Sequence, residues 1–175
     1  MSLISIIQKC LSPDNIIRNE GEKQLQSKIN ENYSQILLEI VEILTNENQE
    51  ENIRQYSATF IRYLFNNPTY LTKWDNTEQN FRELIKSKIL ACLASNSQII
   101  RKSTSISIAA ICKYEIPKKS WPNIIDILNS TALNKENVNY RITSLIAIGH
   151  ILDELNISDL NNEKNKIALI IILLL

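Results

Sequence analysis

An arginine in a fixed setting recurs along this chain at intervals of roughly 40 residues, and this register constrains the fold more than any other feature. An apolar or aromatic residue precedes each arginine, and apolar residues follow it at the seventh and eleventh positions. That spacing returns to one face of an α-helix, so the register predicts four equivalent amphipathic helices. The four arginines are Arg18, Arg54, Arg101 and Arg141.

The residue four positions before each arginine is able to cap a helix, because its side-chain oxygen can accept a hydrogen bond from a first-turn N–H. The two acidic ones could also pair with their arginines at i,i+4. We therefore expect helices to begin close to these four positions: Asp14, Glu50, Ser97 and Asn137.

A second set of apolar stripes lies between the arginine-bearing segments. We expect these A helices near residues 2–11, 33–46, 77–95, 121–132 and 162–175. The arginine-bearing B helices are expected near residues 13–30, 50–66, 97–115 and 136–155. A helix pair repeated at this period is typical of HEAT repeats, and the gap between Asn30 and Tyr33 has no room for the third helix of an armadillo repeat. The predicted fold is all-α, an α–α superhelix (HEAT-repeat solenoid) of about four helix pairs plus the first helix of a fifth.

The predicted division places four HEAT repeats in residues 1–157 and the first helix of a truncated fifth repeat in residues 158–175. The apolar run from Ile167 to Leu175 is far shorter than the about 20 residues that a membrane span needs. We therefore expect a core helix there and no membrane insertion. Because its partner helix is missing, we also expect self-association through residues 167–175.

The repeated arginines have a structural interpretation. In stacked helix pairs each B helix lies beside the next, so an arginine at one fixed position could bond the capping residue of its neighbour. Arg18, Arg54, Arg101 and Arg141 would then form a ladder along the stack. The extra segment between the second and third repeats holds Trp74, which we expect to pack against the following A helix.

Composition excludes several classes of function. The net charge is zero, which argues against nucleic-acid binding, and two glycines are too few for a many-stranded β fold. Three dispersed cysteines and one histidine make no metal-ligand pattern, and no phosphate loop, nucleophile elbow or zinc-protease motif is present. We expect no cofactor, no metal and no enzymatic activity. What remains is a binding surface on the polar side of the B helices.

Several motifs, in order, resemble the N-terminal region of the importin-β (karyopherin-β) family. They are "EGEKQLQ", "IRQYSATFIRYLFNN", "KWDN" followed by "FRELIKSKILACL", "YEIPKKSWPNIIDIL" and "TSLIAIGHILDEL". The "EIPKKSWPNII" junction is the most specific of them. There, Ile116-Pro117 should end the third B helix, Ser120 should cap the fourth A helix, and Trp121 should fill the corner between repeats.

The resemblance implies a nuclear transport receptor that moves between cytoplasm and nucleus through the nuclear pore. It implies Ran-GTP as the partner of the first repeats on their concave B helices. Phenylalanine-glycine nucleoporins would bind middle repeats, and an importin-α adaptor or cargo would bind later ones. Against the family's "RQ…K-N" signature in the second repeat, Arg62 stands for the lysine and Tyr63 for the asparagine. The candidate Ran contacts are Arg62, Asn66, Lys102 and Ser105.

Two alternatives stay open at this stage. One is a HEAT scaffold subunit of another complex, although such a scaffold has no reason to carry the "EIP…WP" junction. The other is a different β-karyopherin of the exportin or transportin type, because members of the family differ most in parts that this chain does not contain.

Overall fold

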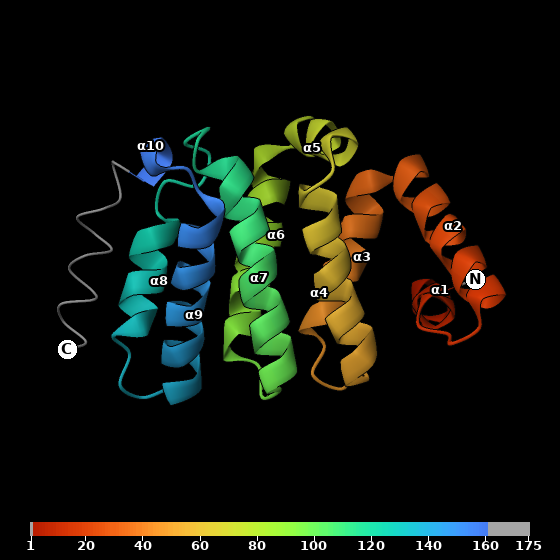
Figure 1. Ribbon diagram of the computed structural model, residues 1–175, viewed down its shortest axis with the longest axis horizontal. Helices are drawn as coiled ribbons and strands as arrows, with labels where there is room; N and C mark the ends of the chain where they lie inside the picture. Colours follow the sequence, from red (N-terminus) through yellow and green to blue (C-terminus); the bar gives the residue numbers. More distant parts are fainter. Residues whose placement is uncertain (1, 161–175) are drawn as a thin grey trace. The chain divides into compact units, whose positions relative to one another are not determined.

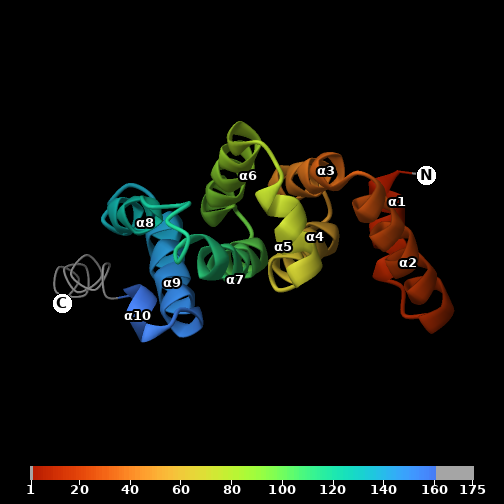
Figure 2. The same cartoon turned by 90° about the horizontal axis from the view of Figure 1, so that it is seen from above.

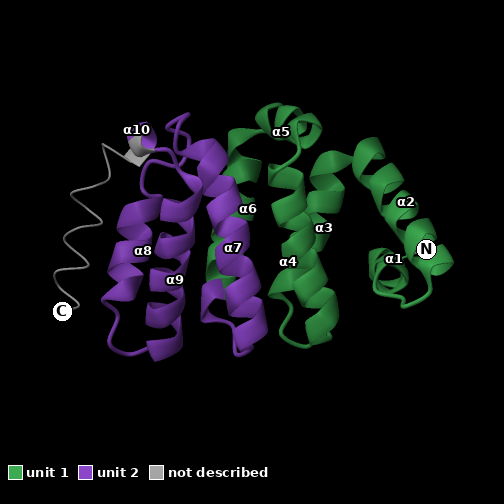
Figure 3. Ribbon diagram, in the orientation of Figure 1, with its two compact units in different colours: residues 1–92 green, residues 93–175 purple. Residues whose placement is uncertain are grey.

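A computed structural model describes residues 2–160, and this part of the chain is helical with no strand (Figure 1). The chain divides into two compact units, residues 1–92 and 93–175, which are treated separately below (Figure 3). None of the described helices is both long enough and apolar enough to span a membrane. The predicted helix at 162–175 and the predicted self-association through 167–175 lie outside the described residues.

The first unit is built from successive helices packed in pairs (Figures 1 and 2). Helix α1 packs on α2, α3 packs on α4, and α6 lies against α3. The apolar stripes predicted from the sequence form the core, where Leu37, Ile53 and Ile85 are completely buried. The helices are α1 (Leu3–Cys10), α2 (Asn15–Glu31), α3 (Tyr33–Thr45), α4 (Glu51–Phe65), α5 (Pro68–Asp75) and α6 (Gln79–Ala91).

Helices α1 and α2 approach each other closely at Gly21. A Cβ atom added there would lie 2.7 Å from the backbone nitrogen of Cys10 and 2.7 Å from the Cβ of Lys9. These atoms belong to the last turn of α1 and have little freedom to move. The absence of a side chain at position 21 is therefore what lets the first helix pair close.

Helix α5 fills the extra segment between repeats, which the sequence did not predict to be helical. Asn67 caps it by accepting a hydrogen bond from the Thr69 N–H at 3.0 Å, and Pro68 occupies its first turn, where a missing N–H costs nothing. Trp74 is fully buried, and its ring meets the edge of Phe65 with 5.0 Å between centroids. The ring contact that the structure shows is with α4, where the sequence had pointed to the helix after α5.

The second unit repeats the pairing with α8 packed on α9 and α9 packed on α7. Its core includes Ile108 and Leu128, which lie on predicted apolar stripes, and also Ile111 and Ile151, which were not among the predicted positions. A short 3₁₀ turn, η1 (Cys92–Ala94), precedes these helices. They are α7 (Gln98–Glu115), α8 (Ile124–Ala132), α9 (Val138–Glu154) and α10 (Ile157–Leu160).

The proline-rich junction between α7 and α8 ends one helix as predicted but starts the next one later. Helix α7 ends at Glu115, immediately before Ile116-Pro117, and Trp121 is buried with 3% exposure. Helix α8 begins only at Ile124, so the prediction that Ser120 caps it is wrong. The intervening turn passes through Lys119 at a positive φ of 56°, and the Ser120 N–H donates back to the Glu115 carbonyl at 3.0 Å.

Candidate partner-binding surface

The exposed side of α4 carries a stripe of polar side chains. Gln55, Thr59, Arg62 and Asn66 recur at helical spacing, and all four are exposed. Within the described residues the Arg62 guanidinium makes no hydrogen bond or ion pair, so its donors are open to a partner. The sequence analysis selected Arg62 and Asn66 but missed Gln55 and Thr59, although the same spacing would have found them.

Arg62 and Asn66 lie at the C-terminal end of α4, where the backbone fixes one relative to the other. Asn66 is the C-cap residue, and its N–H donates to the Arg62 carbonyl at 3.1 Å. The last carbonyls of a helix carry partial negative charge, which favours a cation such as Arg62 in the final turn. This end of α4 therefore presents a guanidinium and a side-chain amide together.

Tyr63 departs from the family signature and points to a different use of its position. Its side chain is 45% exposed, and its hydroxyl accepts a hydrogen bond from the Asn67 side-chain amide at 3.3 Å. The ring stacks on Phe60 at 5.7 Å between centroids and tilts against Tyr70 at 5.9 Å. Tyr63 thus belongs to an aromatic cluster beside the polar stripe.

The two candidates on α7 differ in accessibility. Lys102 is exposed near the start of the helix, as a contact residue must be. Ser105 is completely buried, and its hydroxyl donates to the Lys102 carbonyl at 2.8 Å. The expectation that Ser105 touches a partner is wrong, because a small polar side chain here satisfies itself within the helix and faces the core. Lys102 belongs to the second unit, so it is considered apart from Arg62 and Asn66.

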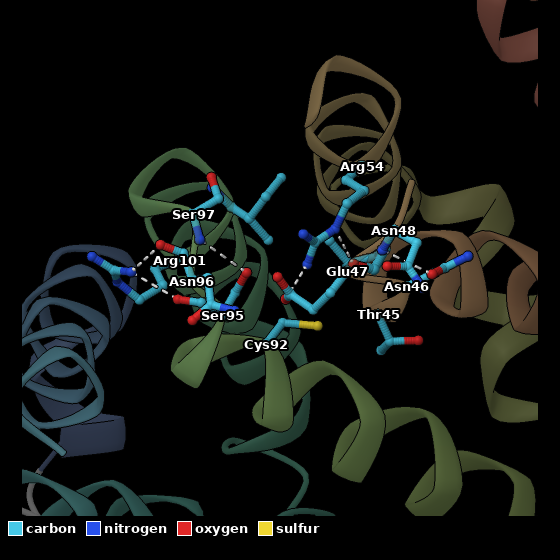
Figure 4. A network of polar contacts seen from close by, with 12 residues as sticks. Thr45, Asn46, Glu47, Asn48, Arg54, Cys92, Ser95, Asn96, Ser97 and Arg101 are labelled. Carbon is cyan, nitrogen blue, oxygen red and sulfur yellow. Dashed lines mark hydrogen bonds and ion pairs between the residues drawn. The ribbon is translucent and has the colours of Figure 1, made fainter. Parts of the chain in front are cut away.

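Arg54 is the most deeply buried of the repeated arginines, with 3% exposure (Figure 4). Its Nε donates to the Leu44 carbonyl at 2.9 Å, and its Nη2 donates to Glu47 Oε1 at 2.6 Å. Leu44 lies in the last turn of α3 and Glu47 in the loop that follows. Arg54 therefore fastens the turn that joins the two helices of its own repeat.

Arg101 and Arg18, like Arg54, donate to carbonyl groups of residues that precede them in the chain. Arg101 donates to the carbonyls of Ser95 and Asn96 at 2.7 and 3.0 Å (Figure 4). Arg18 donates to the Ser12 carbonyl at 3.3 Å and to the Asn15 side chain. These bonds close turns just before each B helix, whereas the predicted ladder placed the bonds between repeats. For Arg141, half-buried in α9, the described part of the chain shows no such bond.

Three of the four expected caps are formed. Asp14 accepts from the N–H groups of Ile16 and Ile17, Ser97 accepts from Ile100, and Asn137 accepts from Tyr140. Glu50 occupies the N-cap position of α4 without a side-chain capping bond. Its longer side chain does not fold back as Ser or Asp does, and Arg54 pairs with Glu47 in the loop.

The titratable groups of the first unit stabilise the fold and form no reactive centre. Burial raises the pKa of the Cys92 thiol to about 12, although the positive charge of Arg54 acts in the opposite direction. Burial also raises the pKa of Cys10, whose thiol hydrogen-bonds to Tyr56. Both thiols therefore stay protonated and unreactive at neutral pH. Over residues 2–160, no group of His, Cys, Asp and Glu side chains is arranged to hold a metal ion.

Comparison with curated proteins finds relatives along most of this chain, although no protein-family model matches it. Importin subunit beta-1 of Schizosaccharomyces pombe is 23% identical over 95% of the chain and 20% of its own length. The Saccharomyces cerevisiae protein of the same name is 30% identical over 82% of the chain and 17% of its length. Exportin-2 of Xenopus laevis is 32% identical over 70% and 12%. The chain thus spans about a fifth or less of these relatives.

Comparison with solved structures also finds importin-β proteins. A crystal structure of importin beta superposes with a TM-score of 0.87 at 30% identity, over 94% of this chain and 20% of the other. A structure in which Kap95p binding induces the switch loops of RanGDP to adopt the GTP-bound conformation matches with a TM-score of 0.82 at 24% identity, over 89% and 19%. A Kap95:Nup1 complex matches at 0.86 and 24% identity, over 98% and 21%.

Helix pairs at this period, with structural neighbours of this kind, define an all-α HEAT-repeat solenoid protein. Within that class, the chain belongs to the importin-β (karyopherin-β) family.

Proposed function

We propose that this chain is the N-terminal, Ran-binding part of an importin-β-type transport receptor and has no catalytic role. The observation that carries the proposal is the exposed stripe on α4, where Arg62 and Asn66 lie together and the guanidinium is unengaged. Arginine is suited to such a contact because its planar fork can donate two parallel hydrogen bonds to a carboxylate or to backbone carbonyls.

The proposed contacts on the first unit are Arg62 and Asn66 on α4, extended along the same face by Gln55 and Thr59. Lys102 on α7 is proposed separately, as a contact of the second unit. Support for Ran as the partner comes from the family and from the Kap95p structure that contains Ran. In that complex, Kap95p binding induces the switch loops of RanGDP to adopt the GTP-bound conformation, which supports a binding mode coupled to those loops. We infer a preference for the GTP-loaded form.

The other proposed assignments extend beyond the described residues. We propose that residues 1–157 form the first four HEAT repeats and that a fifth begins in 158–175. Binding to nucleoporins is supported by the Kap95:Nup1 complex, and traffic between cytoplasm and nucleus by the family as a whole. Contacts with an importin-α adaptor or with cargo would belong to later repeats of a longer protein.

An export receptor is the second candidate, favoured by the relatives named exportin-2 at 32% identity. The contacts proposed on α4 do not separate the two candidates.

Calorimetric titration with Ran loaded with either a non-hydrolysable GTP analogue or GDP tests the proposal. We expect tighter binding of the GTP form and at least a tenfold loss for the Arg62→Ala, Asn66→Ala double variant, as for a binding hot spot. The matched control is Lys135→Ala, an exposed cation in the loop before α9, which should bind normally. Equal affinity for the two nucleotide forms, or unchanged binding by the double variant, would remove the α4 stripe from the site.

A further inference from the structure

The first unit contains a pocket of about 330 Å³ beside the α4 stripe, and Thr59 is the one proposed Ran contact that lines it. Its walls come from three helices: α2 supplies Glu22 and Gln26, α4 supplies Tyr56, Phe60 and Tyr63, and α5 supplies Tyr70. A volume at the low end of the roughly 300–1,000 Å³ range of ligand sites suits one long side chain better than a cofactor.

Four aromatic rings line the pocket as a continuous row. Tyr56 stacks on Phe60 with 6.3 Å between centroids and 11° between planes, and Phe60 stacks on Tyr63 at 5.7 Å and 30°. Tyr63 then turns against Tyr70 at 5.9 Å and 60°. The angle between neighbouring ring planes increases along the row, so the rings face the pocket in different orientations. Such an arrangement can surround a side chain.

Hydrogen bonds hold these rings in place. The Tyr56 hydroxyl bonds to the buried Cys10 thiol, and the Tyr70 hydroxyl bonds to the side chain of Gln26. Tyr63 accepts from Asn67 at 3.3 Å. Because the three tyrosine hydroxyls already have partners, ordering these side chains costs less when a ligand binds.

The charge of the lining is negative. Glu22 is an exposed carboxylate, and no lysine or arginine lines the pocket. The faces of aromatic rings also carry negative electrostatic potential, which attracts Lys and Arg cations within about 6 Å. Outside the pocket lining, Lys73 Nζ lies 5.8 Å from the centroid of the Tyr70 ring while it donates to Asn30.

We propose that this pocket binds the cationic side chain of an arginine or lysine in an extended segment of a partner protein. The stem of that side chain lies along the rings of Phe60 and Tyr63, and its charged end reaches Glu22. The proposal rests on the pocket alone. The Ran test varies Arg62 and Asn66, which do not line the pocket, so either proposal can fail without the other.

The test is an NMR titration of the chain, carrying labelled tyrosine and phenylalanine, with acetylated peptides of sequence Gly-Ser-X-Ser-Gly. The central residue X is arginine, lysine, trimethyl-lysine, norleucine or phenylalanine. We expect saturable shifts at Tyr56, Phe60 and Tyr63 with the three cationic peptides, and binding about tenfold weaker for the neutral norleucine peptide. Equal binding of the norleucine or phenylalanine peptide, or no saturable shift at all, would overturn a cation site.

Two variants separate charge from shape. Glu22→Gln should weaken the cationic peptides about threefold to tenfold and leave the norleucine peptide unchanged. Phe60→Leu keeps an apolar side chain but removes the ring, so it should lower the affinity for cations alone. The matched control is Glu31→Gln, which removes an exposed carboxylate from the same helix outside the pocket. If Glu31→Gln weakens the cationic peptides as much as Glu22→Gln does, general charge attraction replaces the pocket as the explanation.

Discussion

Arg54 lies almost wholly inside the first unit, yet its guanidinium reaches Glu47 at 2.6 Å, and the Glu47 side chain is 44% exposed. A buried charge is tolerated because its partners satisfy it, one of them at the solvent boundary and the other the Leu44 carbonyl at 2.9 Å. The pair joins the core to the surface at the turn between α3 and α4.

Replacing Arg54 by methionine is expected to lower the free energy of unfolding by about 1–3 kcal/mol, since the Leu44 carbonyl loses its donor in a buried setting. Urea unfolding followed by circular dichroism measures the change. Arg18→Met is the matched comparison, because Arg18 is half-buried and its bond to the Ser12 carbonyl is longer, at 3.3 Å. An equal loss in both variants would contradict a special role for the α3–α4 turn.

Gly21→Ala should destabilise the protein although alanine is the better helix former. The new Cβ would come within 2.7 Å of α1 backbone, and overpacking of that kind costs about 1–3 kcal/mol. Gly149→Ala on α9 is the internal control, because a Cβ there meets nothing within 4 Å. That variant should gain up to about 1 kcal/mol from helix propensity. Thermal unfolding of the two variants should therefore shift in opposite directions.

Asp14 and Glu50 are both acidic N-cap residues, but their replacement should change stability by different amounts. Asp14→Ala removes hydrogen bonds to two N–H groups of α2 and should cost about 1 kcal/mol. Glu50→Ala should change stability little, since Glu50 makes no side-chain capping bond. Denaturation midpoints measured side by side check the contrast. A larger effect at Glu50 than at Asp14 would show that the glutamate acts through its charge at the start of α4.

The raised pKa of Cys92 predicts a loss of stability at alkaline pH. The unfolded thiol ionises near its ordinary pKa of 9.0, while the folded thiol holds its proton up to about 12. Above pH 9 the unfolded state therefore binds fewer protons, and the free energy of unfolding falls as pH rises. Unfolding curves between pH 7 and 11 measure this slope, which should be shallower for Cys92→Ser. A thiol reagent at neutral pH should leave Cys92 unmodified until urea is added.

The sequence predicts the eight main helices well because their apolar stripes are long and each ends near a cap or a proline. Helix α5 was not predicted because Asn67 and Pro68 are residue types common in loops. Here they serve as the N-cap and the first residue of the helix. Ser105 was misplaced because helical spacing alone does not show which neighbours cover a small hydroxyl. The partners of Arg54 depend on how close the end of α3 comes to α4, and the pocket depends on α5, so neither follows from local pattern.

The α3–α6 packing also affects where the chain can be divided. The sequence repeat suggests a cut after Asn76, before the third A helix begins. The compact unit instead continues to Cys92, because α6 contributes Ile85 and Ile89 to a core that it shares with α3. A fragment ending at Asn76 would leave the α3 side of that core facing water and invite aggregation, whereas one ending at Cys92 keeps it covered. The boundary of the compact unit thus falls inside a sequence repeat and not between two repeats. A fragment of this chain is better designed from the compact unit than from the repeat.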